Sequence, residues 1–259
     1  MTVKTYGNFI ANKWQDATGG EFVAVRDPSN GQEFARIARG TRDDIDLAVR
    51  SARAALSGDW GRLTPTERGR VLTRISAGVL RNIDLLTELE ARDVGKPLTQ
   101  ARADVVALAR YLEFYGGAAD KVHGDTIPYQ NGFTVLTVYE PHGVTGHIIP
   151  WNYPMQILGR SLGAALAMGN AAVVKPAEEA CLTILEFARI AEEEGLPSGA
   201  LNIVTGFGSL QAAFAVGMTS VATFARLARS QVIQIAGADF VEAAYGSGAT
   251  QTQVLFRHV

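Results

Sequence analysis

The first forty residues show short runs in which apolar and polar positions alternate. Residues 9–14 and 22–25 are the clearest of these runs, and such alternation is typical of β-strands. Thr18, Gly19 and Gly20 lie between the two runs and are residues that favour turns. The pattern predicts two short strands joined by a hairpin-like turn at residues 18–20.

Residues 41–122 carry apolar positions at helical spacing. Thr41 and Thr64 each stand where a helix cap is expected, and Pro65 and Glu67 complete the second cap. A third helical pattern begins near Pro97. The pattern predicts three scaffold helices, followed by an extended run at residues 133–139, whose β-branched and aromatic residues favour a strand.

After residue 142 the pattern alternates between short apolar runs and helical runs. Strands are predicted at 143–149, 171–175 and 201–205, with helices at 155–168 and 181–194. Such alternation predicts an α/β fold with a parallel sheet that is covered on both faces. Since ligands bind such sheets at the carboxyl ends of the strands, the residues that follow each strand are the candidates for chemistry.

Composition excludes several classes of protein. The 259 residues are 47% hydrophobic, which is enough to form a core, and 24 Lys and Arg against 26 Asp and Glu leave no basic excess for binding nucleic acid. The apolar stretch 155–174 is interrupted by Arg160 and Asn170, so we expect no membrane span. The N-terminus has no apolar signal segment, and we expect a cytoplasmic protein.

Asn152 follows the first of these strands, between Pro150 and Pro154. Its amide could stabilise an oxyanion as a neutral donor, or it could simply cap the helix that follows. Lys175 and Glu178 follow the second strand. They could bind the hydroxyls of a ribose, as acidic residues do in dinucleotide folds, or form an ordinary surface ion pair.

The other candidates are weaker. Gly206 and Gly208 follow the third strand and allow close backbone approach, but the third glycine of the dinucleotide fingerprint is absent. Cys181, the single cysteine, lies in a helical stretch and is expected to be a small buried residue. The four histidines have no metal-ligand spacing, so no metal site is expected.

The motifs after the three strands, taken in order, resemble the aldehyde dehydrogenase superfamily. The resemblance covers about residues 5–209. Its segments are Glu140-Pro-His-Gly-Val144, Ile149-Pro-Trp-Asn-Tyr-Pro154, Gly169-Asn170, Lys175-Pro-Ala-Glu178, Gly195-Leu-Pro197 and Leu201-Asn-Ile-Val-Thr-Gly206-Phe-Gly208, together with Asp27-Pro28 and Gly95-Lys-Pro97. It implies the N-terminal half of an aldehyde dehydrogenase, with a Rossmann-type sheet, N-terminal helices and a β-stranded bridging element.

The resemblance also implies roles for individual residues. Asn152 matches the oxyanion donor, whereas Lys175 and Glu178 match contacts to the adenosine ribose of NAD, with Glu178 disfavouring NADP. The remaining matches are in the cofactor cleft: Ile149, Pro150 and Trp151 in its wall, and Gly206 and Gly208 on its adenine side. The implied substrate is a small aldehyde. Residues 140–209 are most similar to bacterial enzymes for aromatic aldehydes, with aliphatic aldehydes and semialdehydes left open.

The resemblance divides the chain into four regions. Residues 1–122 hold the N-terminal strands and helices of the cofactor domain, 123–141 the bridging strands, 142–209 the βαβαβ NAD-binding core and 210–259 a divergent tail. Members of the family oligomerise through the bridging strands. We expect a chain of this length to need a partner for solubility, because its sheet would expose apolar edges.

The family's reaction needs a cysteine nucleophile and a glutamate base, and the segments that carry them are not found in the 259 residues. We therefore expect this chain to be inactive alone. The alternative is a non-catalytic nucleotide-binding fragment or an assembly partner of an intact relative. Phe224-Ala-Arg-Leu227 stands where the family has a Phe-Thr-Gly-Ser segment. A single-base insertion that shifts the reading frame would produce this change, and we expect the tail to be frameshifted or decayed.

Overall fold

A five-stranded sheet lies at the centre of the computed structural model, which describes residues 3–207. Three of its strands, β8 (Val144–Ile149), β9 (Ala171–Pro176) and β10 (Leu201–Ile203), are parallel neighbours, as the sequence predicts. Two N-terminal strands, β2 (Asn8–Ile10) and β3 (Lys13–Gln15), extend the sheet beyond β10 in the order β3-β2-β10-β9-β8. Because β2 runs antiparallel to β10, the predicted parallel strands are part of a mixed sheet.

The prediction of one strand over residues 9–14 is wrong. Ala11 and Asn12 both adopt positive φ angles, of 53° and 54°, and turn the chain back so that β2 and β3 form a tight hairpin. The hairpin expected at residues 18–20 is also wrong, because β3 and the next strand, β4 (Phe22–Arg26), belong to different sheets. β4 instead pairs with β5 (Glu33–Ala38), and β5 pairs with β1 (Lys4–Tyr6).

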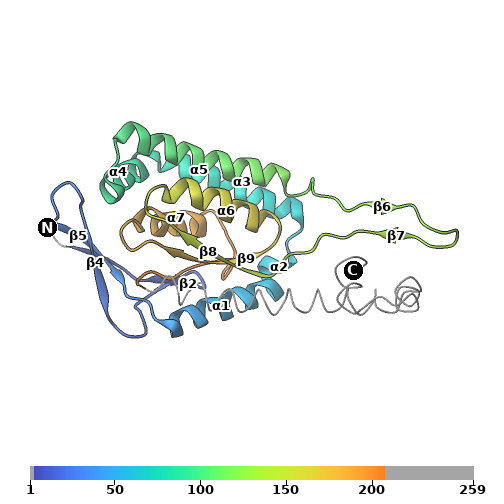
Figure 1. The fold of residues 1–259 in the computed structure, drawn as a ribbon, viewed down its shortest axis with the longest axis horizontal. Coiled ribbons are helices and arrows are strands. Elements are labelled where there is room, and N and C mark those ends of the chain that lie inside the picture. Colours follow the sequence, from blue (N-terminus) through green and yellow to red (C-terminus); the bar gives the residue numbers. More distant parts are fainter. Residues whose placement is uncertain (1–2, 208–259) are drawn as a thin grey trace, which may run out of the picture. The chain divides into compact units, whose positions relative to one another are not determined.

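Helices cover both faces of the central sheet. The helix α1 (Arg42–Ser57) packs on β9 and β10 from one side, and α6 (Pro154–Ala167) and α7 (Leu182–Glu193) lie on the other (Figure 1). An outer layer packs on α6 and α7. It consists of α3 (Pro65–Arg81), α4 (Ile83–Val94) and α5 (Leu98–Ala118), while the short α2 (Asp59–Arg62) follows α1. Sandwiched in this way, β9 is buried at every position.

The helix starts follow the predicted caps. At α3, the Thr64 hydroxyl accepts a hydrogen bond from the Glu67 amide at 3.3 Å, and the Glu67 carboxylate accepts one from the Thr64 amide at 2.7 Å. Reciprocal bonds of this kind satisfy amides that a helix start leaves without partners. The sequence pattern did not separate α4 from its neighbours. Asn82 is both the end of α3 and the start of α4, so no turn residues mark the boundary.

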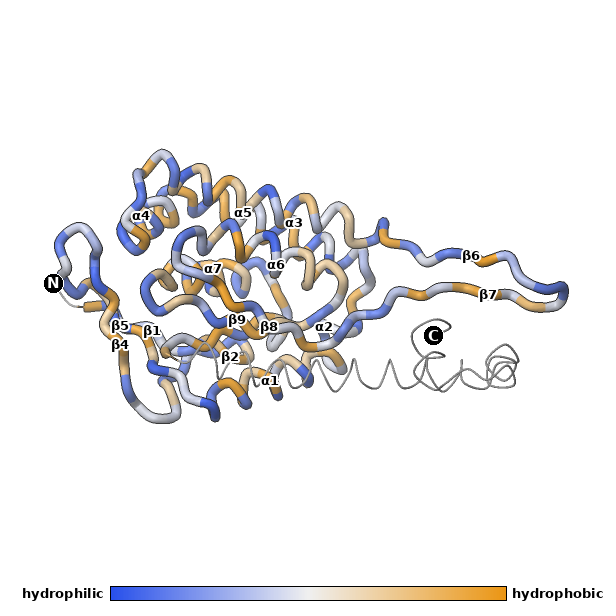
Figure 2. The backbone as a smooth tube through the Cα atoms, in the orientation of Figure 1, coloured by the Kyte–Doolittle hydropathy of each residue, from blue (hydrophilic) through white to orange (hydrophobic). Residues whose placement is uncertain are grey.

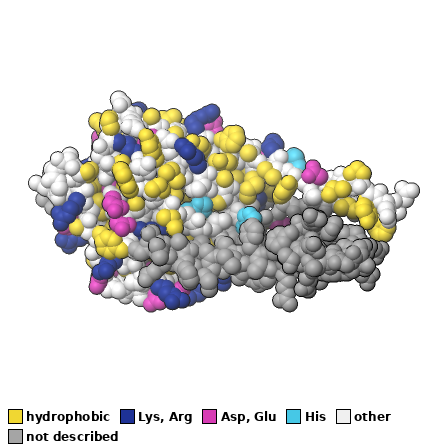
Figure 3. Space-filling view, viewed as in Figure 1, with side chains coloured by type: hydrophobic (Ala, Val, Ile, Leu, Met, Phe, Trp, Pro, Cys, Tyr) yellow, Lys and Arg dark blue, Asp and Glu magenta, His cyan; other side chains and the backbone are white. Residues whose placement is uncertain are grey.

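Residues 122–139 form a two-stranded ribbon that extends away from the helices (Figure 1). Only β6 (Thr126–Ile127) and β7 (Val135–Leu136) pair within it, so the extended run 133–139 is mostly not a regular strand. Figure 2 shows that the tip of the ribbon is hydrophilic while its two strands carry apolar residues. Figure 3 shows hydrophobic side chains on the surface of the ribbon. The exposed ones are Val122, Ile127, Tyr129, Phe133, Leu136, Val138 and Tyr139.

The remaining predictions concern a membrane span and the C-terminal tail. Across residues 3–207, no helix is long and apolar enough to cross a membrane. The region 210–259, with its expected frameshift, lies outside the described residues.

Candidate functional site

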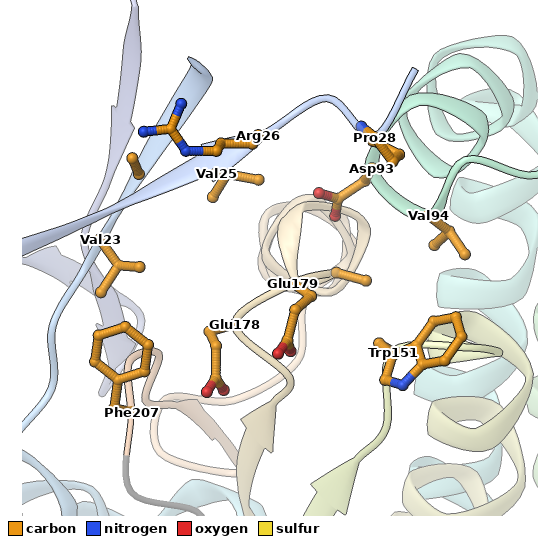
Figure 4. Close-up of a pocket in the computed structure, with 12 residues that line it drawn as sticks. Val23, Val25, Arg26, Pro28, Asp93, Val94, Trp151, Glu178, Glu179 and Phe207 are labelled. Carbon is orange, nitrogen blue, oxygen red and sulfur yellow. The ribbon is translucent and has the colours of Figure 1, made fainter. Parts of the chain in front are cut away.

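A cavity of about 540 Å³ lies beside the carboxyl ends of β8 and β9. Figure 4 shows the carboxylates of Glu178 and Glu179 between Phe207 on one side and Trp151 on the other. The cavity is lined by Val23, Ala24, Val25, Arg26, Pro28, Asp93, Val94, Trp151, Glu178, Glu179, Ala180 and Phe207. Its size and its mixture of apolar walls with a few polar groups are typical of a small-molecule site.

Glu178 is held at the cavity by Lys175. The ammonium of Lys175 lies 2.7 Å from one oxygen of Glu178, and the Lys175 side chain is only 6% exposed while that of Glu178 is 27% exposed. The interpretation as an ordinary surface ion pair is therefore wrong for the lysine. Partial burial raises the pKa of Glu178, but the hydrogen bonds from Lys175 and the backbone outweigh it and lower the pKa below its usual value. Glu178 is an anion that can still accept hydrogen bonds from a ligand.

Asp93 is a third carboxyl group of the cavity wall, beside Glu178 and Glu179, and sequence reasoning missed it. One of its oxygens accepts a hydrogen bond from the amide of Leu182 at 2.8 Å and so caps the start of α7. The other oxygen is buried and, among residues 3–207, has no hydrogen-bond partner. Burial raises the pKa of Asp93 to about 7, the Leu182 amide opposes this, and the negative charge of Glu90 adds to it. The group therefore keeps its proton to a much higher pH than an ordinary aspartate does.

The turn between β8 and α6 carries Trp151 and Asn152. Trp151 is 58% exposed and forms one end of the cavity. The helix cap of α6 is Tyr153 rather than Asn152, so the interpretation of Asn152 as a cap is wrong. The Asn152 side chain is exposed, and within the described residues its amide donates no hydrogen bond to the protein. It is thus available to a ligand, as an oxyanion donor must be.

The lining of this cavity includes Trp151 but neither Ile149 nor Pro150, whose place in the wall of a cofactor cleft stays a prediction. Ile149 is 1% exposed and packs in the core, and Pro150 is exposed but lies outside the lining. The strand β4, Pro28 and Phe207 line this cavity. Asp27-Pro28 was recognised in the sequence as one of the segments of the family resemblance, but nothing local signals that it faces the end of β9.

Gly206 packs on the backbone instead of lining the cavity. Its φ is +112°, and a Cβ added there would lie 2.6 Å from the Gly40 nitrogen. This close approach lets the chain turn after β10 and place Phe207 at the cavity, where the Arg39 guanidinium lies 5.5 Å from the ring centroid. Gly208 lies outside the described residues.

Gly206→Ala is expected to destabilise the fold, because the added methyl group meets backbone atoms that cannot move aside cheaply. Backbone strain of this kind costs about 1–3 kcal/mol before any steric term. The measurement is the free energy of unfolding in guanidinium chloride. The matched control is Gly117→Ala in α5, where an added Cβ meets no atom within 4 Å. We expect the control to be neutral or stabilising, and equal losses in both variants would contradict the role of close packing at Gly206.

Cys181 does not take part in the site. It is fully buried at the start of α7, and burial raises the pKa of its thiol well above the usual value. Such a thiol is a poor nucleophile, which confirms the expectation of a buried structural residue. Over residues 3–207, no group of three or more His, Cys, Asp and Glu side chains could hold a metal ion.

Comparisons with known proteins identify the family. The family model described as "Aldehyde dehydrogenase family" matches residues 14–234. The mitochondrial aldehyde dehydrogenase of Mesocricetus auratus is 42% identical over 203 residues, which cover 77% of this chain and 41% of that protein. The chain thus spans about two fifths of the length of the curated relatives it matches.

Comparison with solved structures identifies the same family. A crystal structure of a protein from Burkholderia cenocepacia, assigned to the aldehyde dehydrogenases, is 64% identical with a TM-score of 0.79, covering 80% of this chain and 44% of that one. The NAD+ complex of the Bacillus cereus aldehyde dehydrogenase is 35% identical with a TM-score of 0.80, covering 82% and 44%. The α/β sheet, the order of its strand-end motifs and these matches agree, and the chain belongs to the aldehyde dehydrogenase family.

Proposed function

We propose that the cavity beside β8 and β9 binds the adenosine part of NAD, and that this chain contributes this half-site to the oxidation of an aldehyde. The observation that carries the proposal is the Glu178 carboxylate, which is fixed by Lys175 at the wall of the cavity. A fixed carboxylate accepts two hydrogen bonds from a ribose diol and repels a phosphate at the 2′ position. The Bacillus cereus relative was solved with NAD+, which supports the choice of ligand.

Each group of the site has a part in this proposal. Trp151 and Phe207 offer flat apolar surface at the two ends of the cavity, and Lys175 is close enough to Glu178 to share a ribose hydroxyl. NAD supplies a hydride acceptor when it is bound. The exposed Asn152 amide stabilises the negative charge that develops on the aldehyde oxygen.

The chemistry of acyl transfer needs a nucleophile, and the single cysteine of the 259 residues is the buried Cys181. For a polypeptide of these residues alone we therefore propose nucleotide binding without turnover. Nucleotide binding without turnover is also what the alternative function requires, namely a non-catalytic fragment that binds nucleotide or assembles with an intact relative. An aromatic aldehyde remains our proposal for the substrate class, on the likeness of residues 140–209.

We also propose that the β6–β7 ribbon mediates self-association. Its exposed Phe133, Leu136, Val138 and Tyr139 form an apolar surface of the kind that marks an interface. Sedimentation velocity of the 259-residue chain is expected to show an oligomer, and Leu136→Asp with Val138→Asp is expected to reduce its size. A monomer at every concentration would contradict this assignment.

Binding of NADH by the purified 259-residue chain tests the cofactor proposal. The emission of Trp151 overlaps the absorption of the nicotinamide, so bound NADH is expected to quench tryptophan emission and to emit itself. Trp151→Phe should remove most of this energy transfer, whereas Trp14→Phe is the matched control, because Trp14 is also partly exposed but does not line the cavity. No saturable signal with wild-type protein would refute the proposal. Formation of NADH from NAD+ and benzaldehyde by the same chain would refute the absence of turnover.

A further inference from the structure

A buried cluster of charged side chains lies behind the turn that carries Trp151 and Asn152. Lys96 is at its centre, in the junction between α4 and α5, and its side chain is only 7% exposed. Its ammonium donates to Glu90 at 2.9 Å and to Asp104 at 2.7 Å, and these two carboxylates are 0% and 2% exposed. Two buried carboxylates hold the position of one ammonium group in the fold.

The third hydrogen bond of Lys96 goes to a residue outside the cluster. An ammonium has three protons, and the third is donated to the backbone carbonyl of Asn152 at 3.3 Å. Within residues 3–207, this carbonyl accepts no other hydrogen bond. The same ammonium lies 4.9 Å from the ring centroid of Tyr153, a distance that is favourable for a cation–π interaction.

The backbone of Lys96 is fixed as well. Gly95 caps the end of α4 with a φ of +77°, and Pro97 caps the start of α5, so the residue between them has little freedom. The cluster also connects to the surrounding helices. Gln156 of α6 donates to Asp104 at 2.6 Å, and Thr183 of α7 donates to Glu90 at 2.8 Å. Lys96 therefore connects this rigid cluster to the backbone of the turn, and a second contact comes from Gln100, whose amide donates to the Tyr153 hydroxyl at 2.9 Å.

From this arrangement we propose that Lys96 is the positioning residue of the site, which holds the Asn152 peptide and thereby orients the Asn152 amide and the Trp151 ring. The inference rests on the proposed function, since the value of orienting these two groups lies in the binding of cofactor and aldehyde. Lys96 itself does not line the cavity and is not a catalytic residue.

The test is the ¹⁹F NMR spectrum of the 259-residue chain labelled with 5-fluorotryptophan. The chain has three tryptophans, so Trp14 and Trp60 are internal controls in each spectrum. Lys96→Met is expected to shift or broaden the Trp151 resonance and to leave the other two unchanged. It should also weaken NADH binding about tenfold, since a charge-assisted hydrogen bond no longer orders the turn.

Thr183→Val is the matched control variant. It removes a hydrogen bond from the same cluster, to Glu90, but leaves the bond from Lys96 to Asn152 in place. The Trp151 resonance and the NADH affinity should therefore match those of the wild type. The positioning role is refuted if Thr183→Val and Lys96→Met shift the Trp151 resonance by the same amount. It is also refuted if Lys96→Met shifts the Trp151 resonance no further than it shifts the Trp14 resonance.

A second variant covers the case in which Lys96→Met does not fold, because it leaves two buried carboxylates without a partner charge. The triple variant Glu90→Gln, Lys96→Met, Asp104→Asn is neutral and still removes the donor to Asn152. An unchanged Trp151 resonance in the triple variant would also refute the role. If the wild type fails to bind NADH, the proposed function fails, while the Trp151 resonance still decides the role of Lys96.

Discussion

Asp93→Asn is expected to make the fold markedly more stable near neutral pH. Burial raises the pKa of Asp93 from 3.8 to about 7, so the folded state binds a proton that the unfolded state releases between these two values. Stability linked to this proton is fully present below pH 4 and is lost as the pH rises toward 7. A shift of about three pKa units corresponds to up to about 4 kcal/mol at pH 7 and above. Asparagine keeps an acceptor for the Leu182 amide but has no charge to bury.

The measurement is the free energy of unfolding in urea from pH 5 to pH 8. The difference between variant and wild type should grow with pH across this range and level off above 7. Asp27→Asn is the control, and its expected change in the free energy of unfolding has the opposite sign. Hydrogen bonds from Ser29 and Arg92 lower the pKa of Asp27, so the charged carboxylate stabilises the fold. This variant should lose stability by the same amount throughout pH 5 to 8, because the stabilisation by an aspartate with a lowered pKa disappears only as the pH falls below 3.8. A difference for Asp93→Asn that does not vary with pH would contradict the assigned protonation.

The strand-end residues could be predicted because their signals are local. A buried apolar run identifies β9, and the rule that ligands bind at carboxyl ends then points to Lys175 and Glu178, which the structure brings to within 2.7 Å of each other. The same reasoning reached Asn152, which follows β8 between two prolines, whereas Trp151 was predicted only from the family resemblance. Short-range pattern and a general rule of topology were sufficient in both cases.

The rest of the site depends on packing between segments that are distant in the sequence. Asp93 has the pattern of an ordinary polar helix position, and only the docking of α4 on α7 buries it and makes it a cap for Leu182. The wall formed by β4 depends on a second sheet that the pattern did not reveal. The turn at Ala11 contains no glycine that would indicate a positive φ, so the β2–β3 hairpin was predicted as one strand.

Glu178→Gln is expected to change the choice between NADH and NADPH by about tenfold or more. A carboxylate about 4 Å from a phosphate on a protein surface repels each unit of its charge by about 4 kcal/mol at an effective dielectric constant of 20, and Lys175 offsets part of this. The amide removes the repulsion and also weakens acceptance from the ribose hydroxyls, so NADH affinity should fall while NADPH affinity rises. Equilibrium titration with both nucleotides, followed by Trp151 energy transfer, gives the ratio.

The adjacent Glu179 provides a matched control for this substitution. Glu179→Gln removes the same charge from the same cavity, but Glu179 is exposed and is not the residue that Lys175 fixes. If Glu178 contacts the ribose, Glu179→Gln should change both affinities slightly and by similar factors. An equal change in the NADH to NADPH ratio for both variants would mean that the cavity selects by its overall charge. Because the ratio is measured within each variant, a loss of folded protein cancels, and the comparison isolates the contact made by one carboxylate.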